Sequence, residues 1–185
     1  MQLSSTLFDY KCSCGYRGKF EQYTDSIRCQ KCKVETPQIN GITVFTDEQS
    51  NQTQLFDSIY SEGHLNATQQ INNIKTQNYE SHAEFALQYL CIGGYDLDTG
   101  LNGISILDAA CGTGWTSAAC LKHQNLNNCK IHAFDISING LHLLKEHTNN
   151  FSTTNTLELS VQDAEAMCFA PDTFDVIIGS SILHH

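Results

Sequence analysis

A strand, a glycine-containing turn and a helix follow one another near the middle of the chain, and this succession restricts the fold more than any other feature. The apolar run 104–107 predicts a strand, which ends at Asp108. Gly112 and Gly114 follow in a turn, and residues 115–122 have the character of a helix. Glycines let backbone approach a ligand closely, and the helix N-terminus offers free N–H groups. The stretch therefore predicts an α/β fold that binds a nucleotide-like ligand.

The sequence Asp-Ala-Ala-Cys-Gly-Thr-Gly at 108–114 resembles the first motif of class I S-adenosylmethionine (SAM)-dependent methyltransferases, usually Asp-x-Gly-Cys-Gly-Thr-Gly. Ala110 departs from the glycine of that motif, and we expect only a slightly tighter turn. The resemblance implies cofactor contacts from Asp108, Ala110, Cys111, Gly112 and Gly114. Asp108 and Cys111 also have structural interpretations, as a turn cap and a buried packing residue. A glycine turn alone is weak support, because flavin- and NAD-binding folds use similar turns.

The order of the next segments strengthens the resemblance. Residues 130–137 predict a second strand that ends at Asp135, about 20 residues past the glycine turn, which is the usual offset of a ribose-binding carboxylate. Solvation at the end of a strand is the structural alternative for Asp135. In the family pattern, Ile136 lies against the face of the adenine.

Two later segments complete the cofactor side. The Asp-Ala-Glu turn after the third predicted strand resembles the family turn in which Asp163 reaches the adenine amino group and the Ala164 N–H serves the ring. Residues 174–185 are similar to the fourth strand and following loop of ubiquinone/menaquinone-biosynthesis-type methyltransferases, with Ser180 on the cofactor side. His184 and His185 are candidate groups on the substrate side.

These segments predict a Rossmann-like class I methyltransferase sheet in residues 79–185, with strands one to four of the usual order 3-2-1-4-5-7-6. The fourth strand would then be an edge, although it is nearly all apolar, and such edges invite pairing with another chain. The simplest expectation is the front part of a longer methyltransferase. The alternative is a shortened chain that a partner chain completes.

The N-terminal module, residues 1–46, carries a second signal. Cys12 and Cys14 are followed by Cys29 and Cys32, with 14 residues between the pairs. Two close pairs at this separation predict a structural zinc site, because four thiolates close the tetrahedral shell. Disulfides and ordinary thiols are the alternatives. Residues 36–45 resemble the closing strand of the zinc ribbons that begin some methyltransferases. The polar stretch 47–78 predicts a linker or cap segment with one or two short helical turns.

Composition limits the choice of partner and compartment. The formal net charge of −10 argues against broad binding of nucleic acid, without excluding it, because that affinity depends on neutralising phosphates. No N-terminal targeting signal and no apolar run long enough to cross a bilayer is present. Of the 9 cysteines, the five outside the two pairs are scattered along the chain, which favours a reducing, cytoplasmic environment.

The resemblance implies a SAM-dependent methyltransferase that transfers a methyl group to a small-molecule acceptor. The sulfonium already activates the methyl group, so proximity and alignment supply most of the catalysis and no catalytic residue is assigned. One alternative is an rRNA or tRNA methyltransferase that grips RNA with the ribbon. Another is a non-enzymatic interaction protein in which the ribbon docks a partner.

Overall fold

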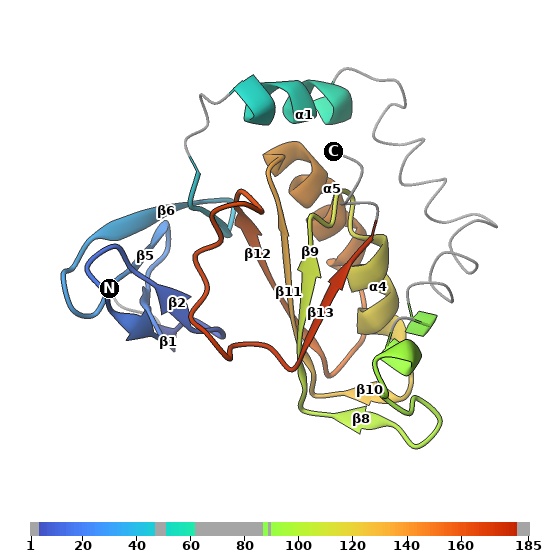
Figure 1. Ribbon diagram of the computed structural model, residues 1–185. Coiled ribbons are helices and arrows are strands. Elements are labelled where there is room, and N and C mark those ends of the chain that lie inside the picture. The colour runs from blue at the N-terminus through green and yellow to red at the C-terminus, as the bar shows by residue number, and fades with distance from the viewer. Residues whose placement is uncertain (1–3, 47–50, 62–86, 89, 181–185) are drawn as a thin grey trace.

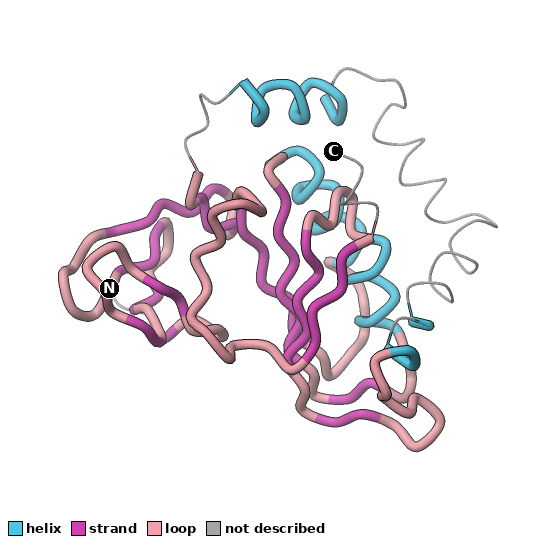
Figure 2. Tube along the Cα trace, in the orientation of Figure 1, coloured by secondary structure: helices cyan, strands magenta, loops and turns pink. Residues whose placement is uncertain are grey.

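The structure, a computed structural model, describes residues 4–46, 51–61, 87–88 and 90–180 (Figure 1). Helices lie against one face of a central sheet, and a unit of short strands and loops adjoins that sheet (Figure 2). The strands are β1 (Ser4–Ser5), β2 (Tyr10–Lys11), β3 (Arg17–Gly18), β4 (Glu21–Gln22), β5 (Ser26–Arg28), β6 (Glu35–Ile39), β7 (Ile42–Val44), β8 (Leu101–Asn102), β9 (Ser105–Ala109), β10 (Leu126–Asn127), β11 (Lys130–Asp135), β12 (Thr156–Val161) and β13 (Val176–Gly179). The helices are α1 (Asn51–Ser61), α4 (Trp115–Lys122) and α5 (Ile138–Thr148).

Four parallel strands form one end of a nine-stranded sheet in the order β12-β11-β9-β13, and β13 is its outer strand in the part of the chain that the structure describes. The register places Ala109 opposite both Phe134 and Gly179, and Asp135 opposite Val161, so the strands end at nearly one level. This order confirms the predicted 3-2-1-4 arrangement, and the helix predicted at 115–122 is α4. The turns that follow these strands therefore share the carboxyl edge of the sheet, where ligands bind in open α/β folds.

One face of the sheet packs against α4 and α5. Successive strand residues point to opposite faces, and along β11 the side chains of Ile131 and Ala133 take the helix side. Ile131 lies in a buried cluster with Leu121, and Ala133 lies in another with Leu141 and Leu144. Full burial of one such aliphatic side chain contributes about 1.5–3 kcal/mol. These two clusters hold α4 and α5 against one face of the sheet.

Aromatic side chains cover the opposite face of β11. Phe8, Phe169 and Phe174 surround the His132 ring at centroid distances of 5.1, 4.8 and 6.3 Å. His132 is fully buried, and its Nε2 lies 2.7 Å from the Ser160 hydroxyl. Burial lowers the pKa of His132 to about 3, so the ring stays neutral. The N-terminal segment and the loop between β12 and β13 thus bury a face that in parallel sheets is normally covered by helices.

The cysteine-containing unit is joined to the sheet by its last hairpin. Asn40 and Gly41, with φ angles of 50° and 75°, form the two-residue turn between β6 and β7, as expected for an Asn-Gly turn of type I′. β7 then pairs in parallel with β12, with Thr43 opposite Ser160. The pairing extends the parallel sheet and covers the free edge of β12.

Part of the predicted linker is a helix. Within residues 47–78 the structure describes α1, which lies above the carboxyl edge of the sheet and contacts α5 (Figure 1). The remainder of that stretch, and the candidates His184 and His185, lie outside the described residues. Across the ranges that the structure describes, no helix is long and apolar enough to span a membrane.

Gly114 is the N-cap of α4, and two features of its position require glycine. Its φ is +77°, and an added Cβ would lie 2.3 Å from Leu144 Cδ1. We expect Gly114→Ala to lower the free energy of unfolding more than Gly103→Ala. Gly103 has a φ of +75° and open space around it, so its substitution reports the backbone cost alone, about 1–2 kcal/mol. The clash should add about 1–3 kcal/mol in urea denaturation.

A Leu144→Ala background provides the control, because it removes the clashing methyl groups. There the two glycine variants should be destabilised equally. An equal effect in the parent background would contradict the contact between the α4 turn and α5.

Candidate cofactor crevice and cysteine cluster

The turn between β9 and α4 lies at the carboxyl edge of the sheet, where open α/β folds have their ligand crevice. Ala110 has a φ of 52°, a left-handed conformation that glycine adopts without cost. The Cys111 N–H donates to the Phe134 carbonyl at 2.9 Å, and the Gly114 N–H donates to the Cys111 carbonyl at 2.8 Å. Burial raises the pKa of the Cys111 thiol well above its ordinary value, so the side chain is an unreactive packing group. The turn keeps the geometry of a glycine motif at some cost in strain at Ala110.

Asp108 holds the start of α4. Gly114 is the N-cap of this helix and has no side chain that could cap it. The buried Asp108 carboxylate takes that role from β9, since its Oδ2 accepts from the Ser117 N–H at 2.9 Å and from the Ser117 hydroxyl at 2.7 Å. Burial raises the pKa of Asp108 to about 6 despite these bonds. Asp108 therefore has a structural role as a capping residue, the structural interpretation that the sequence offered.

Asp135 connects the end of β11 to the glycine turn. Its Oδ2 accepts from the Gly112 N–H at 2.8 Å, and its Oδ1 accepts from the Ser137 N–H at 2.9 Å. The side chain is 6% exposed, and burial raises its pKa, with a smaller contribution from the charge of Asp57. The Ile136 N–H also donates to this carboxylate, so three of its roughly four acceptor positions are used and one is left for a ligand hydroxyl.

The predicted adenine side lies on the turns after β11 and β12. Ile136 is half-buried, and the half-buried Asp163 accepts from the Glu165 N–H at 2.8 Å in a tight turn. Ala164 is exposed, and so is Ser180, which follows β13. The Gln162 N–H donates to the Asp135 carbonyl at 3.0 Å, which ties these turns together. The topology thus brings the predicted cofactor residues to one edge of the sheet.

Asp57 on α1 lies beside the predicted cofactor residues at the start of α5, and the sequence did not predict it. Its Oδ1 accepts from the Ser137 hydroxyl at 2.6 Å and from the Asn139 N–H at 3.3 Å, at the N-terminus of α5. A carboxylate is favourable there because it meets the positive end of the helix dipole. Ser137 is the N-cap of α5, but no local pattern links it to Asp57, which lies 80 residues away in the sequence.

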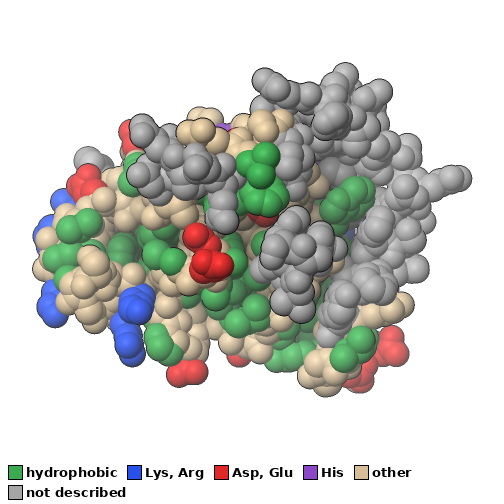
Figure 3. Space-filling view, turned by 45° about the horizontal axis from the view of Figure 1, so that its top comes forward, with side chains coloured by type: hydrophobic (Ala, Val, Ile, Leu, Met, Phe, Trp, Pro, Cys, Tyr) green, Lys and Arg blue, Asp and Glu red, His purple; other side chains and the backbone are tan. Residues whose placement is uncertain are grey.

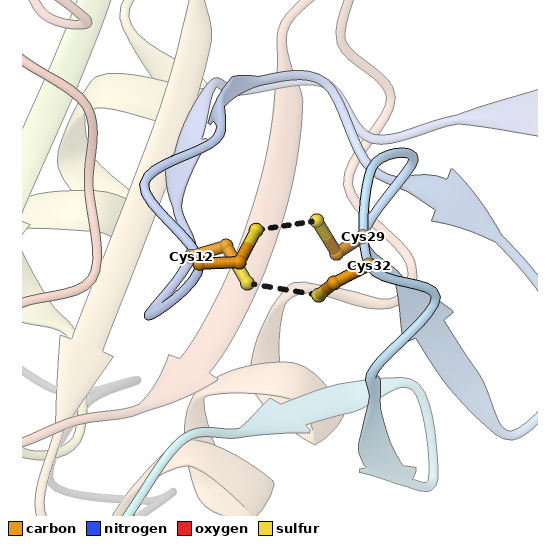
Figure 4. A group of neighbouring side chains, drawn as sticks. Cys12, Cys29 and Cys32 are labelled. Carbon is orange, nitrogen blue, oxygen red and sulfur yellow. Dashed lines mark hydrogen bonds between the residues drawn. The ribbon is translucent and has the colours of Figure 1, made fainter.

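The four predicted metal ligands lie together. Figure 4 shows Cys12, Cys29 and Cys32 with their sulfur atoms directed toward one another from two turns. The Sγ atoms of Cys12 and Cys32 are 3.5 Å apart, those of Cys14 and Cys29 are 3.8 Å apart, and all four lie within 4.8 Å of one another. A tetrahedron with metal–sulfur bonds of about 2.3 Å has edges of about 3.8 Å, so the arrangement fits zinc.

Backbone N–H groups support a thiolate cluster. The N–H groups of Tyr16 and Val34 donate to the sulfurs of Cys14 and Cys32. The bond from Tyr16 is the main cause that lowers the pKa of Cys14 to about 7, which favours the thiolate that binds metal. Burial and the three neighbouring sulfurs outweigh the Val34 bond and raise the pKa of Cys32 to about 12, so a positive ion among the sulfurs is needed before all four are thiolates. The four cysteines form no disulfide, which leaves their sulfurs available to a metal ion.

Residues 106–185 match the model of a protein family described as "Methyltransferase domain". The matched stretch contains the glycine turn, the strands β11, β12 and β13 and all of β9 except Ser105, and the fold of this part is that of class I methyltransferases. No curated protein matches the chain.

Several solved structures resemble the chain at low sequence identity. A protein assigned as an S-adenosyl-L-methionine-dependent methyltransferase from Methanococcus maripaludis shares 15% identity over 76% of this chain and 55% of its own, with a TM-score of 0.49. The magnesium protoporphyrin IX methyltransferase of Synechocystis PCC 6803, with bound SAH, shares 19% over 74% and 56%, with a TM-score of 0.40. The MccD protein shares 26% over 51% and 38%, with a TM-score of 0.40. The chain spans roughly half the length of the first and second of these structures.

The strain at Ala110 leads to a prediction about stability. We expect Ala110→Gly to raise the free energy of unfolding by up to about 1 kcal/mol, because relief of the left-handed backbone outweighs the added chain entropy. Urea denaturation measures the change. Ala109→Gly, in the regular strand β9, is the matched control and should lower stability by about 0.5–1 kcal/mol. Equal losses in the two variants would be incompatible with strain at Ala110.

Proposed function

We propose that this chain binds SAM at the carboxyl edge of the sheet and transfers its methyl group to a small-molecule acceptor. The observation that carries the proposal is the hydrogen bond from the Gly112 N–H to Asp135, which joins a glycine turn to a strand-end carboxylate. In α/β folds a glycine turn of this kind holds the ligand, and a carboxylate about 20 residues later binds its ribose. The family match over residues 106–185 supports the same chemistry.

Charge in the crevice favours a cationic ligand. Burial raises the pKa values of Asp108 and Asp135, and Asp57 adds a third carboxylate beside the start of α5. Negative charges held in this way repel one another, and a ligand with positive charge relieves that cost. SAM carries a sulfonium and an ammonium group, whereas a dinucleotide carries phosphates that these carboxylates would repel.

Each residue has a role in binding or orientation. Asp135 accepts from the ribose hydroxyls, while Asp108 fixes the glycine turn and α4 near the amino-acid end of the ligand. Ile136, Asp163 and Ala164 bound the adenine, and Ser180 lies on the cofactor side of β13. When bound, SAM supplies a methyl group on a sulfonium, so alignment of the acceptor provides most of the rate enhancement.

The charge distribution favours a small acceptor over RNA. Six of the ten lysines and arginines lie between Lys11 and Lys33, and blue side chains gather at this end of the molecule in Figure 3. Arg28 and Lys33 are already paired with Glu21. Four thiolates around a divalent ion carry net negative charge, which nearby cations neutralise. The excess of basic residues thus balances the charge of the cysteine cluster and is not needed to bind RNA. The similarity of residues 174–185 to quinone-type enzymes separately favours a small-molecule acceptor.

We further propose that the four cysteines hold a structural zinc ion. They fill all four coordination positions, which leaves none for a substrate. The ion would fix the two turns of the ribbon and would contribute to its folding.

Binding of SAM can be tested by isothermal titration of the zinc-loaded protein. We expect a micromolar dissociation constant and a loss of affinity of about tenfold or more in Asp135→Asn, because one charge-assisted hydrogen-bond acceptor is removed. Asn keeps an oxygen for only one of the two backbone N–H groups, those of Gly112 and Ser137, so circular dichroism checks that the variant is folded. The control is Asp98→Ala, an exposed carboxylate on the segment leading to β8.

Two results would count against the proposal. A folded, zinc-loaded parent that binds no SAM would refute the cofactor site. Unchanged affinity in Asp135→Asn would place the ligand elsewhere. If SAM binds but no methyl group reaches any component of a cell extract, the non-enzymatic interaction protein becomes the better account.

Zinc binding is tested by elemental analysis of protein purified under reducing conditions. We expect one equivalent in the parent and a marked loss in Cys32→Ser, because serine is a poor zinc ligand. Cys91→Ser is the control, since both cysteines are exposed but Cys91 lies outside the cluster. Equal zinc in the two variants would show that the four cysteines are ordinary thiols.

A further inference from the structure

The loop between β12 and β13 has no helix of its own to hold it. It begins with the turn of Asp163 and Ala164 and runs in front of the sheet toward the cysteine-containing unit (Figure 1). Its first part is closed by the Ala166 N–H, which donates to the Asp163 carbonyl at 3.0 Å, and by the Cys168 N–H, which donates to Gln162 Oε1 at 2.8 Å. The position of the turn therefore depends on what holds residues 168–170.

Residues 9–11 hold that part of the loop. The Lys11 N–H donates to the Cys168 carbonyl at 2.9 Å, and the Ala170 N–H donates to the Asp9 carbonyl at 3.1 Å. Tyr10 and Phe169 form an antiparallel bridge between these bonds, and their rings are stacked with centroids 5.6 Å apart. The loop thus obtains its strand pairing from the N-terminal segment.

Residues 9–11 directly precede Cys12, the first of the four clustered cysteines. Tyr10 is fully buried in one apolar cluster with Cys12 and Cys29, and Phe169 packs against that cluster. The Tyr10 hydroxyl donates to the half-buried carboxylate of Glu158 on β12, which fixes the ring between the cysteines and the sheet. A metal ion that orders the turn after Cys12 therefore also orders the segment that pairs with the loop.

We propose that Tyr10 and Phe169 are positioning residues for the adenine side of the cofactor crevice, and that metal at the four cysteines strengthens SAM binding through them. The inference rests on the proposed function. By linkage, SAM must strengthen metal binding by the same factor. Tyr10 and Phe169 touch neither ligand; they set the place of the Asp163–Ala164 turn.

Hydrogen exchange tests, in the absence of SAM, whether metal at the four cysteines orders the loop between β12 and β13. Amides of the loop, above all those of Cys168 and Ala170, should exchange more slowly in the zinc-loaded protein than in protein stripped with a chelator. Amides of α5 and β11 should exchange equally in both forms, which excludes general unfolding. Equal exchange of the loop amides in the two forms would overturn the proposal.

Titration calorimetry tests the effect on affinity. Zinc should raise the affinity for SAM by about tenfold, a typical coupling. Phe169→Ala should lose most of this dependence while retaining one equivalent of zinc, and Phe169→Tyr should restore it. Phe151→Ala, a half-buried phenylalanine on the helix side of the sheet, is the control and should keep the full dependence.

The outcomes separate the two proposals. A zinc-loaded parent that binds no SAM refutes the proposed function and with it the effect on affinity, and the exchange experiment still decides whether the metal positions the loop. SAM affinity that is independent of zinc refutes the coupling alone. If zinc raises the SAM affinity of Phe169→Ala as much as that of the parent, the role assigned to Tyr10 and Phe169 is refuted.

Discussion

The parallel pairing of β9 with β11 is the constraint on which the crevice depends. It places the end of β11 level with the turn after β9, so that the Asp135 carboxylate meets the Gly112 N–H at 2.8 Å. A register shift of one residue would turn Asp135 to the aromatic face of the sheet and bring His132 and Phe134 to the helix side. The buried aliphatic clusters beneath α4 and α5 exclude that shift, because it would bury the wrong side chains.

Carboxylates fix the starts of both helices that face the crevice. Asp108 bonds to Ser117 at the start of α4, and Asp57 bonds to Ser137 at the start of α5. Each interaction is favourable with the helix dipole but keeps a charge in a poorly solvated place. These bonds gather negative charge at the carboxyl edge of the sheet, which is where the proposed function places a cationic cofactor.

The cysteine-containing unit takes part in the main fold. Its last strand, β7, extends the parallel sheet, and its aromatic residues bury the face that carries His132. The short loop between β12 and β13 completes this cover with Phe169 and Phe174. A cluster of thiols near the N-terminus is thereby connected by contiguous packing to the loop that begins with Asp163.

The sequence by itself determined the central strands, α4 and the paired cysteines, because apolar runs, glycines and ligand spacing act between neighbours in the chain. It also located Ala110 as the departure from the glycine motif, although not the left-handed backbone that makes this residue strained. Tertiary structure alone decided that Asp57 reaches Ser137, 80 residues away, that β7 joins β12, and that Tyr10 stacks on Phe169. These contacts depend on how separate elements pack together, and no local pattern encodes that arrangement.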